Sequence, residues 1–277
     1  MEKQFVWLND NLIPLIQARV SVNDRGFLYG DGLFETLRGQ NGRVQFLAEH
    51  LERLQASARI FRLPFPENIP WPERLAQLLA ANRLNRGPAR IKILLSRGEA
   101  EGLGLPHDCR PTLVIWAQPY TPPLPDEYAA GWPVVVFPEG RSTFVGRHKS
   151  LNYLFYLAAR QYALDRGARE ALILEADGLV SEGSATSLIY LRQGGYYTPA
   201  SASALPGVTV TVLSRGLAPR GLALEPRPTT VAQLQEADGL WLANSLMGLM
   251  PVASLHGTPV PLSQATPLLQ EILADML

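Results

Sequence analysis

The most constraining feature of this 277-residue sequence is the stretch 147–190, where a helical pattern is followed by two apolar segments. The run 171–174 is typical of a buried strand, the pair Asp177 and Gly178 of a hairpin turn, and the run 188–190 of a second strand. Before them, apolar residues recur at three- and four-residue steps on one helical face: Leu151, Leu154, Phe155, Ala158 and Tyr162. A helix followed by paired strands predicts a mixed α/β fold.

Two residues of this stretch, Lys149 and Glu182, indicate chemistry. Ser150 is the expected N-cap of the helix, which places Lys149 where the positive end of the helix dipole disfavours a second positive charge. A lysine with a lowered pKa is what Schiff-base chemistry needs. Glu182 falls in a predicted turn of small residues between apolar strands, where an unpaired carboxylate is costly to bury. A solvated surface residue is the alternative for both, and the local sequence leaves it open.

Composition argues against several function classes. Hydrophobic residues make up 47% and charged residues 18%, and the formal net charge of +0 gives no basic surface for nucleic acid. No apolar run approaches the roughly 20 residues that a membrane span requires. We therefore expect neither nucleic acid nor a membrane as a partner. The single cysteine, Cys109, and the absence of a signal-peptide pattern favour the cytoplasm.

The remaining segments predict two domains joined by a proline-rich linker. We expect a small N-terminal α/β domain at 1–118, an extended linker at 119–126 and a larger C-terminal domain at 127–277. A flexible, glycine-containing stretch at 99–110 is a candidate active-site loop. The expected strands of the first domain are 18–22, 33–38, 90–95 and 112–117, its expected helices are 46–61 and 72–84, and 26–32 is an expected glycine-rich turn.

Downstream, residues 208–217 form an expected helix directly after Pro206 and Gly207. The first N–H groups of a helix lack intrahelical partners and are positively polarised, so this end is a candidate anion site, to which Thr209 adds a hydroxyl. A strand is expected at 240–243, ending at Asn244, and a terminal helix at 263–276.

Six short motifs occur in this order along the chain: DRGFLYGDG at 24–32, HLERL at 50–54, KSLNY at 149–153, EGS at 182–184, YTP at 197–199 and LPGVT at 205–209. Together they resemble the fold-type IV pyridoxal-phosphate enzymes. The family contains branched-chain aminotransferases, D-amino-acid aminotransferases and 4-amino-4-deoxychorismate lyases. The resemblance implies an α/β (α+β) fold of two domains, a small N-terminal α/β domain and a larger, β-barrel-like C-terminal one. It also implies a homodimer, with the 99–110 loop reaching the partner's site.

The resemblance implies a site for pyridoxal 5'-phosphate and no metal. Lys149 would hold the cofactor aldehyde as an imine and move the Cα proton, and Glu182 would keep the pyridine nitrogen protonated. Tyr153 would lie near the ring O3′. His50 and His148 are expected to be structural. The phosphate contacts implied are Arg53, the N–H groups of Val208 and Thr209, and the pair Ser245 and Leu246.

Within this family the sequence favours the lyase. Residues 243–252, ANSLMGLMPV, resemble the lyase signature, and Ser-Arg-Gly at 96–98 is not followed by the Arg-x-His pair of the D-amino-acid enzymes. We expect a small-molecule substrate, 4-amino-4-deoxychorismate, converted to 4-aminobenzoate and pyruvate in folate biosynthesis. A branched-chain or D-amino-acid aminotransferase is the alternative. A catalytically silent protein is a third interpretation, against which the presence of Lys149 and Glu182 argues.

Three residues are candidate substrate contacts: Thr36, Arg97 and Asn244. The sequence departs from some lyases at Gly102, where they carry an arginine for the substrate carboxylate. Arg97 and Arg110 are the alternatives for that role, and the sequence does not decide between them.

Overall fold

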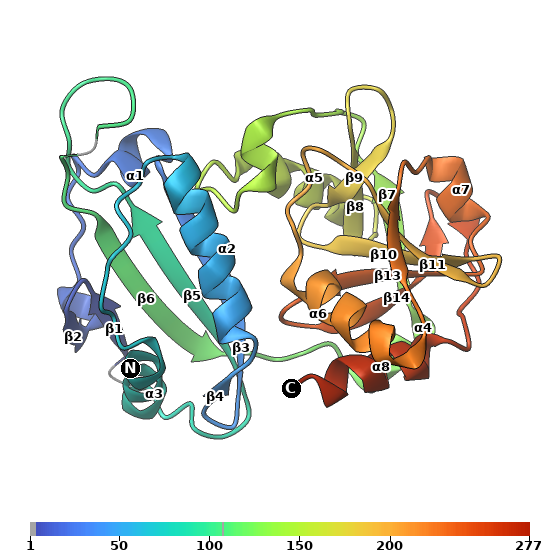
Figure 1. Cartoon of the computed structure of the whole chain (residues 1–277), viewed down its shortest axis with the longest axis horizontal. Helices are drawn as coiled ribbons and strands as arrows, with labels where there is room; N and C mark the ends of the chain where they lie inside the picture. The colour runs from blue at the N-terminus through green and yellow to red at the C-terminus, as the bar shows by residue number, and fades with distance from the viewer. Residues whose placement is uncertain (1–3, 107) are drawn as a thin grey trace. The chain divides into compact units, whose positions relative to one another are not determined.

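The computed structural model describes residues 4–106 and 108–277, and the chain divides into two compact units (Figure 1). The first unit extends to Pro122 and also contains Lys149–Asn152. The second unit comprises Pro123–His148 and Tyr153–Leu277. The division falls inside the predicted linker, in which α4 (Pro125–Ala130) already begins. Residues Lys149–Asn152, which were predicted to lie in the C-terminal domain, belong to the first unit.

The first unit is built on a six-stranded antiparallel sheet in the order β2-β1-β6-β5-β3-β4. Its helices α2 (Leu47–Ile60) and α3 (Trp71–Ala81) pack on one face, where they share a core with the strands (Figure 1). The strands are β1 (Phe5–Leu8), β2 (Asn11–Pro14), β3 (Gly32–Gln40), β4 (Arg43–Val44), β5 (Pro88–Ser96) and β6 (Thr112–Pro119). The short helices are η1 (Leu15–Gln17) and α1 (Arg25–Tyr29).

Alternation of side chains along the central strands gives this sheet two different faces. Leu37, Ile91 and Ile115 point to the helix side and are fully buried. We call the opposite side of β3, β5 and β6 the open face. It carries Phe34, Thr36, Arg90, Lys92 and Trp116, and the antiparallel register places Thr36 directly opposite Lys92 and Lys92 opposite Trp116.

The second unit is built on a mixed nine-stranded sheet in the order β12-β11-β10-β13-β14-β7-β8-β9, with β15 paired to β14. The pairs β11–β12, β14–β7 and β7–β8 are parallel. The strands are β7 (Trp132–Val136), β8 (Glu170–Leu174), β9 (Val180–Gly183), β10 (Ser187–Arg192), β11 (Gly195–Pro199), β12 (Leu224–Arg227), β13 (Gly239–Asn244), β14 (Gly248–Leu255) and β15 (Thr258–Pro259).

Helices cover this sheet over separate apolar clusters. Helix α5 (Leu154–Leu164) packs on β8, and α6 (Val208–Leu217) packs with α8 (Thr266–Asp275) over Trp241. The remaining helices are α7 (Val231–Gln235), η2 (Phe144–Arg147) and η3 (Ala218–Arg220). The mixed α/β architecture confirms the predicted fold class. Among the described residues, no helix combines the length and apolarity that a membrane crossing requires.

Three local predictions are wrong. Residues 18–22 form no strand, because the chain leaves β2 through the short helix η1. The glycine-rich turn at 26–32 is partly helical, since the Asp24 carboxylate caps α1 by accepting from the Gly26 N–H. Helix α5 begins at Leu154 rather than after Ser150, and its buried face is Tyr156, Ala159 and Ala163, whereas Leu154 is 79% exposed.

Two glycines with the same backbone angle test how tightly the turn after β5 is packed. Gly98 and Gly87 both have φ of +73°, but a Cβ at Gly98 would lie 2.0 Å from the Arg110 carbonyl oxygen, and one at Gly87 would meet nothing within 4 Å. We expect Gly87→Ala to cost about 1–2 kcal/mol from backbone strain alone. Gly98→Ala should cost roughly 1–3 kcal/mol more, because main chain must move. Urea unfolding followed by circular dichroism measures both, and equal losses would contradict the expected packing.

Candidate active site

Lys149 lies in an extended segment paired with β3. The Phe34 N–H donates to the Lys149 carbonyl at 2.8 Å, and the Leu151 N–H donates to the Gly32 carbonyl at 2.9 Å. Because α5 begins only at Leu154, the expectation that a helix dipole acts on Lys149 is wrong. Main-chain hydrogen bonds with β3 hold the backbone of Lys149 in place.

The side chain of Lys149 lies over an aromatic ring of that same strand. Its Nζ is 4.7 Å from the centroid of the Phe34 ring, whose residue is 6% exposed. An ammonium over the face of an aromatic ring is held by the ring quadrupole. The amine is thereby directed to the open face, beside the predicted substrate contact Thr36, which is half-buried two residues further along β3.

Arg53, the predicted phosphate contact on α2, is oriented by Glu35. Its Nε donates to Glu35 Oε1 at 2.8 Å and one terminal nitrogen donates to Oε2 at 2.6 Å, while His50 Nδ1 lies 2.7 Å from Oε2. Burial alone would raise the pKa of Glu35, but the charge of Arg53 and the hydrogen bonds from His50 and Arg53 outweigh it and lower the pKa to about 2. Sequence reasoning missed Glu35. The signal that could have identified Glu35 is its position midway between Leu33 and Leu37, which makes it a charged residue on the core side of a strand.

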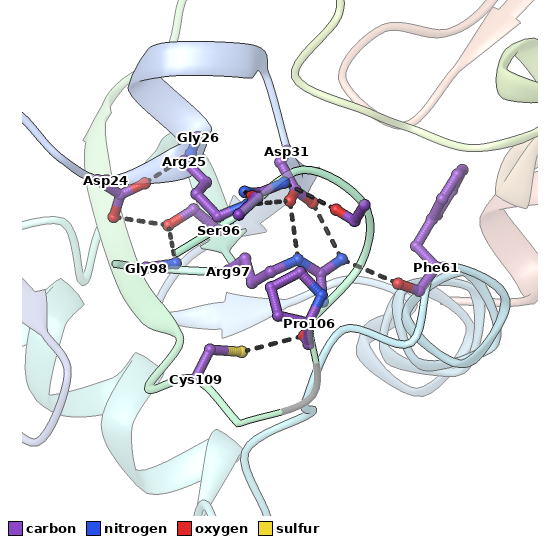
Figure 2. Close-up of polar contacts among 12 residues, drawn as sticks. Asp24, Arg25, Gly26, Asp31, Phe61, Ser96, Arg97, Gly98, Pro106 and Cys109 are labelled. Atoms are coloured by element: carbon purple, nitrogen blue, oxygen red, sulfur yellow. Dashed lines mark hydrogen bonds and ion pairs between the residues drawn. The ribbon is translucent and has the colours of Figure 1, made fainter. Parts of the chain in front are cut away.

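Arg97 is a structural residue, and its predicted role as a substrate contact is not supported. It is fully buried, and all five of its N–H donors have partners inside the first unit (Figure 2). Its Nε and one terminal nitrogen donate to the two carboxylate oxygens of Asp31, and the remaining donors bond the carbonyls of Arg62, Pro106 and Phe61. Because no donor is left, a substrate carboxylate would have to displace an existing bond.

Asp31 joins Arg97 to a second guanidinium, that of Arg25, whose Nε donates to Asp31 Oδ2 at 2.8 Å. The two terminal nitrogens of Arg25 donate to the carbonyls of Gly102 and Gly104. The 99–110 stretch, predicted to be a flexible loop, is thus bonded to Arg25 of α1 at the Gly102 and Gly104 carbonyls and to Arg97, directly after β5, at the Pro106 carbonyl; Figure 2 shows the last of these bonds. His107 of that loop lies outside the described residues.

Glu182 lies in strand β9 and not in a turn, and it is 6% exposed. The Tyr156 hydroxyl donates to its Oε1 at 2.6 Å, and the Leu205 N–H donates to its Oε2 at 3.1 Å. Arg141 in turn donates to the Tyr156 oxygen. Burial and the neighbouring Glu182 charge raise the pKa of Tyr156, so its hydroxyl stays a proton donor to the carboxylate.

Tyr153 lies next to this network. Its ring centroid is 4.9 Å from that of Tyr156, and its hydroxyl donates to the Ser184 carbonyl at 3.2 Å. Burial, with the charges of Glu182 and Glu170, raises the pKa of Tyr153 to about 12. Sequence reasoning found Tyr153 through its motif and missed Tyr156, although the spacing of Tyr156, Ala159 and Ala163 indicates the buried face of α5.

The start of α6 has the features of an anion site. Gly207 is the N-cap and supplies no side-chain cap, so the first N–H groups at Val208 and Thr209 are left to other partners. Thr209 is 3% exposed, and its hydroxyl is without a hydrogen-bond partner among the described residues. A buried hydroxyl of this kind at a positively polarised helix end fits a phosphate oxygen.

Asn244 shapes the neighbouring turn and is not supported as a substrate contact. Its side-chain oxygen accepts the N–H groups of Leu246 and Met247, both at 3.0 Å, and its side-chain nitrogen donates to the Ala185 carbonyl. Ser245 and Leu246, the predicted phosphate contacts, are carried by this turn between β13 and β14.

The predicted residues thus form two groups. Thr36, Arg53, Arg97 and Lys149 belong to the first unit; Tyr153, Glu182, Val208, Thr209, Asn244, Ser245 and Leu246 belong to the second. In the part of the chain that the structure describes, His, Cys, Asp and Glu form no cluster that could hold a metal ion.

Comparison with known proteins identifies the family. The family model for class IV amino-transferases matches residues 32–255, and the chain belongs to this family. Class IV aminotransferases use pyridoxal 5'-phosphate. The particular reaction within the class does not follow from this match.

The relatives are named for different activities. A protein of Methanocaldococcus jannaschii proposed to be a branched-chain-amino-acid aminotransferase is 32% identical over 91% of this chain and 88% of its own. D-alanine aminotransferase of Staphylococcus aureus is 29% identical over 98% of this chain and 95% of its own. A solved structure from Legionella pneumophila, proposed to be a 4-amino-4-deoxychorismate lyase, has a TM-score of 0.85 and 27% identity, over 95% of this chain and 97% of its own.

Glu35 provides a test of the Arg53 geometry. Because the folded-state pKa of Glu35 lies below its ordinary value of 4.5, its charge stabilises the fold above that pH, and the contribution is lost as the pH falls toward 2. We expect Glu35→Gln to lower the free energy of unfolding at pH 7 by on the order of 3 kcal/mol and to flatten its decline on acidification.

Urea unfolding at pH 7 and at about pH 3 measures both effects, since the lower value lies inside the window in which Glu35 titrates. Glu52→Gln, an exposed carboxylate on the same helix as Arg53, is the control and should change stability by less than about 0.5 kcal/mol. If Glu35→Gln unfolds like the wild type at both pH values, Glu35 does not hold Arg53 as described.

Proposed function

We propose that this chain is a pyridoxal-phosphate-dependent lyase that converts 4-amino-4-deoxychorismate to 4-aminobenzoate and pyruvate, a reaction of folate biosynthesis. Membership of class IV supports the cofactor, and the buried Thr209 hydroxyl at the start of α6, which has no hydrogen-bond partner within residues 4–106 and 108–277, fits its phosphate. Within the class, the observation that carries the lyase is segment 243–252, which resembles the lyase signature.

Each residue of the proposed site has a task that its surroundings favour. When bound, pyridoxal phosphate supplies an aldehyde and an electron-withdrawing ring. Lys149 would hold the aldehyde carbon through Nζ and, once released by the substrate amine, would take the proton from the amine-bearing carbon at the same nitrogen. Glu182, whose oxygens accept hydrogen bonds from Tyr156 and Leu205, would hold a proton on the ring nitrogen.

Several residues are proposed contacts of the cofactor phosphate. The N–H groups of Val208 and Thr209 and the Thr209 hydroxyl supply donors, and Arg53 supplies positive charge. The turn of Ser245 and Leu246 completes the set, and the Tyr153 hydroxyl would lie near the ring O3′. Loss of the enolpyruvyl ether as pyruvate then leaves an aromatic ring, which makes elimination favourable.

The signature segment comprises the end of β13, a turn and the first part of β14. Met247, Met250 and Val252 are buried in the core around β14, and Asn244 fixes the turn that carries Ser245 and Leu246. The Legionella protein, similar over 95% of this chain, agrees with this choice.

An aminotransferase acting on branched-chain or D-amino acids is the second candidate. The relatives from Methanocaldococcus jannaschii and Staphylococcus aureus favour it, because both are named for amino-group transfer. It uses the same Lys149 and Glu182 and differs in requiring a keto acid as amino acceptor.

The remaining proposals concern assembly and location. We propose a homodimer, by analogy with the family, in which the 99–110 loop reaches the partner's site. We also propose a cytoplasmic location, and a functional division into a small domain before residue 119 and a cofactor-binding domain after residue 126.

A coupled assay for pyruvate tests the reaction. With 4-amino-4-deoxychorismate as sole substrate and no keto acid, we expect pyruvate and 4-aminobenzoate in equal amounts. Lys149→Ala should lower the rate by at least about 10³-fold, because proton transfer loses its base, while circular dichroism shows an unchanged fold. Turnover of leucine or D-alanine only when a keto acid is added, with no pyruvate from 4-amino-4-deoxychorismate, would establish the aminotransferase instead.

A pair of tyrosines on α5 tests the role of Glu182. Tyr156→Phe removes the donor to Glu182 Oε1 and should lower kcat by about tenfold, which corresponds to about 1.4 kcal/mol of barrier. Glu182→Gln should lower kcat further, by about 10²–10³-fold, because the ring nitrogen loses its ionised partner. Tyr162→Phe on the same helix is the control, and steady-state kinetics should find it unchanged. A Tyr156→Phe enzyme with wild-type kcat would remove Tyr156 from this role.

A further inference from the structure

Four serine hydroxyls surround one carboxylate, that of Glu175, which directly follows β8. Ser142 and Ser203 donate to its Oε2 at 2.6 and 2.9 Å. Ser181 donates to its Oε1 at 3.1 Å, and Ser201 donates to the same oxygen. Burial would raise the pKa of Glu175, but these hydrogen bonds outweigh it and lower the pKa. We call the five residues the serine cluster; the proposed reaction gives none of them a task.

The serine cluster joins three segments of the second unit that are distant in the sequence. Ser142 lies just before η2, Ser181 lies in β9, and Ser201 and Ser203 lie in the loop that leads into α6. The Ser203 hydroxyl connects two of these segments by itself, because it also accepts the Thr143 N–H at 3.0 Å. A change at the central carboxylate therefore acts on all three segments.

The loop that leads into α6 also packs closely against η2. A Cβ at Gly146 would lie 2.2 Å from the Ser203 carbonyl oxygen and 2.6 Å from a terminal nitrogen of Arg141. Both distances are shorter than any that a real Cβ atom adopts, so a side chain at Gly146 would displace the loop. The contact is thus one of main chain with main chain, on the same side of the loop as Thr143.

Side-chain acceptors hold the amide groups of this loop. The N–H groups of Ser203 and Ala204 donate to Ser201 Oγ at 3.1 and 3.0 Å, and the Leu205 N–H donates to Glu182 Oε2 at 3.1 Å. Residues 201–205 belong to neither a helix nor a strand. The order of the loop therefore depends on the serine cluster rather than on secondary structure.

Both hydrogen-bond donors of Glu182 are connected to segments that the serine cluster holds. The first donor, the Leu205 N–H, lies at the end of the loop. The second, the Tyr156 hydroxyl, accepts in turn from Arg141, which directly precedes the first serine of the cluster. The placement of both segments thus decides how each donor meets the Glu182 carboxylate.

We propose that Glu175 is a positioning residue for the cofactor site: through the serine cluster it holds the Leu205 N–H and the Arg141 guanidinium where they set the hydrogen bonds of Glu182. This inference rests on the proposed role of Glu182 at the ring nitrogen of the cofactor. A loop that is ordered in this way before the cofactor arrives lowers the entropic cost of binding.

Hydrogen exchange of the full-length, cofactor-free protein tests the loop without any reaction. We expect Glu175→Gln to speed exchange in peptides covering 201–205 by at least about tenfold, because the new amide nitrogen cannot accept from two of the hydroxyls. Gly146→Ala should have a similar effect from the other side of the loop. Peptides of β13 should exchange as in the wild type, which shows that the sheet is intact.

Glu139→Gln is the matched control, because Glu139 is an exposed carboxylate two residues before Arg141. Its exchange in 201–205 should stay within about twofold of the wild type. An effect as large as that of Glu175→Gln would indicate a general response to lost negative charge and overturn the proposal. Wild-type exchange in Glu175→Gln would also overturn it.

Cofactor affinity and a double-mutant cycle test the step from the cluster to Glu182. Absorbance titration should show that Glu175→Gln raises the Kd for pyridoxal phosphate by about tenfold. On 4-amino-4-deoxychorismate, or on the amino acid that the enzyme proves to use, Glu175→Gln should lower kcat by about tenfold. In a Glu182→Gln background it should lower kcat by less than about twofold, because its effect passes through Glu182. Equal losses in both backgrounds would overturn the positioning role.

The same measurements separate this inference from the proposed function. Wild-type kcat in Glu182→Gln would remove the proposed role of Glu182 and, with it, the positioning role of Glu175. A lowered kcat in Glu182→Gln, together with wild-type exchange and cofactor affinity in Glu175→Gln, would remove only the inference about Glu175.

Discussion

The pairing of buried carboxylates is the constraint on which the candidate site residues of each unit depend. An ionised carboxylate without partners is too costly to bury, so each one gathers donors and thereby fixes the groups that carry them. Glu35 fixes Arg53, and Asp31 fixes Arg25 and Arg97. Glu170, fully buried in β8, accepts from the backbone and hydroxyl of Ser184. In each case the acid itself is remote from chemistry, and its effect is to restrict the freedom of a neighbour.

Glu182 is the acid that we propose as the partner of the cofactor's ring nitrogen. Tyr156 and Leu205 each donate one hydrogen bond to a different oxygen, and Arg141 donates to the Tyr156 oxygen behind it. The Leu205 bond also ties the loop that leads into α6 to strand β9. The carboxylate and the candidate anion site at the start of α6 are therefore positioned by one connected piece of main chain, which suits a ligand with a basic ring nitrogen and a phosphate.

Periodicity predicted most of the elements, because apolar spacing is a local property of the chain. The helix at 208–217 was predicted with its observed bounds, and the strands at 90–95 and 112–117 lie within β5 and β6. The errors arise where pairing with residues distant in the sequence determines the local structure. Residues 149–152 pair with β3, which lies more than a hundred residues earlier, so no local pattern could place Lys149 correctly.

The same distinction between local pattern and distant partners applies to the predicted site residues. A motif identifies the type of residue, as for Lys149, Glu182 and Thr209, but not the partners that occupy its donors. Arg97 has the right chemistry for a substrate carboxylate and is nevertheless fully used by Asp31 and three carbonyls. Asn244 is likewise used by the turn that it caps.

Handling of the cofactor and choice of the substrate are therefore separable in this chain. Lys149 and Glu182 would serve either a lyase or an aminotransferase, because both reactions begin with the same proton removal. We propose that side chains on the open face of the first unit, such as Thr36, distinguish substrates, because strand alternation places them on the side of the sheet opposite the core. A change at Thr36 leaves the helix-side packing of Leu37 and Ile91 intact. Substrate preference can thus change on this face without changing the fold that holds the reactive lysine.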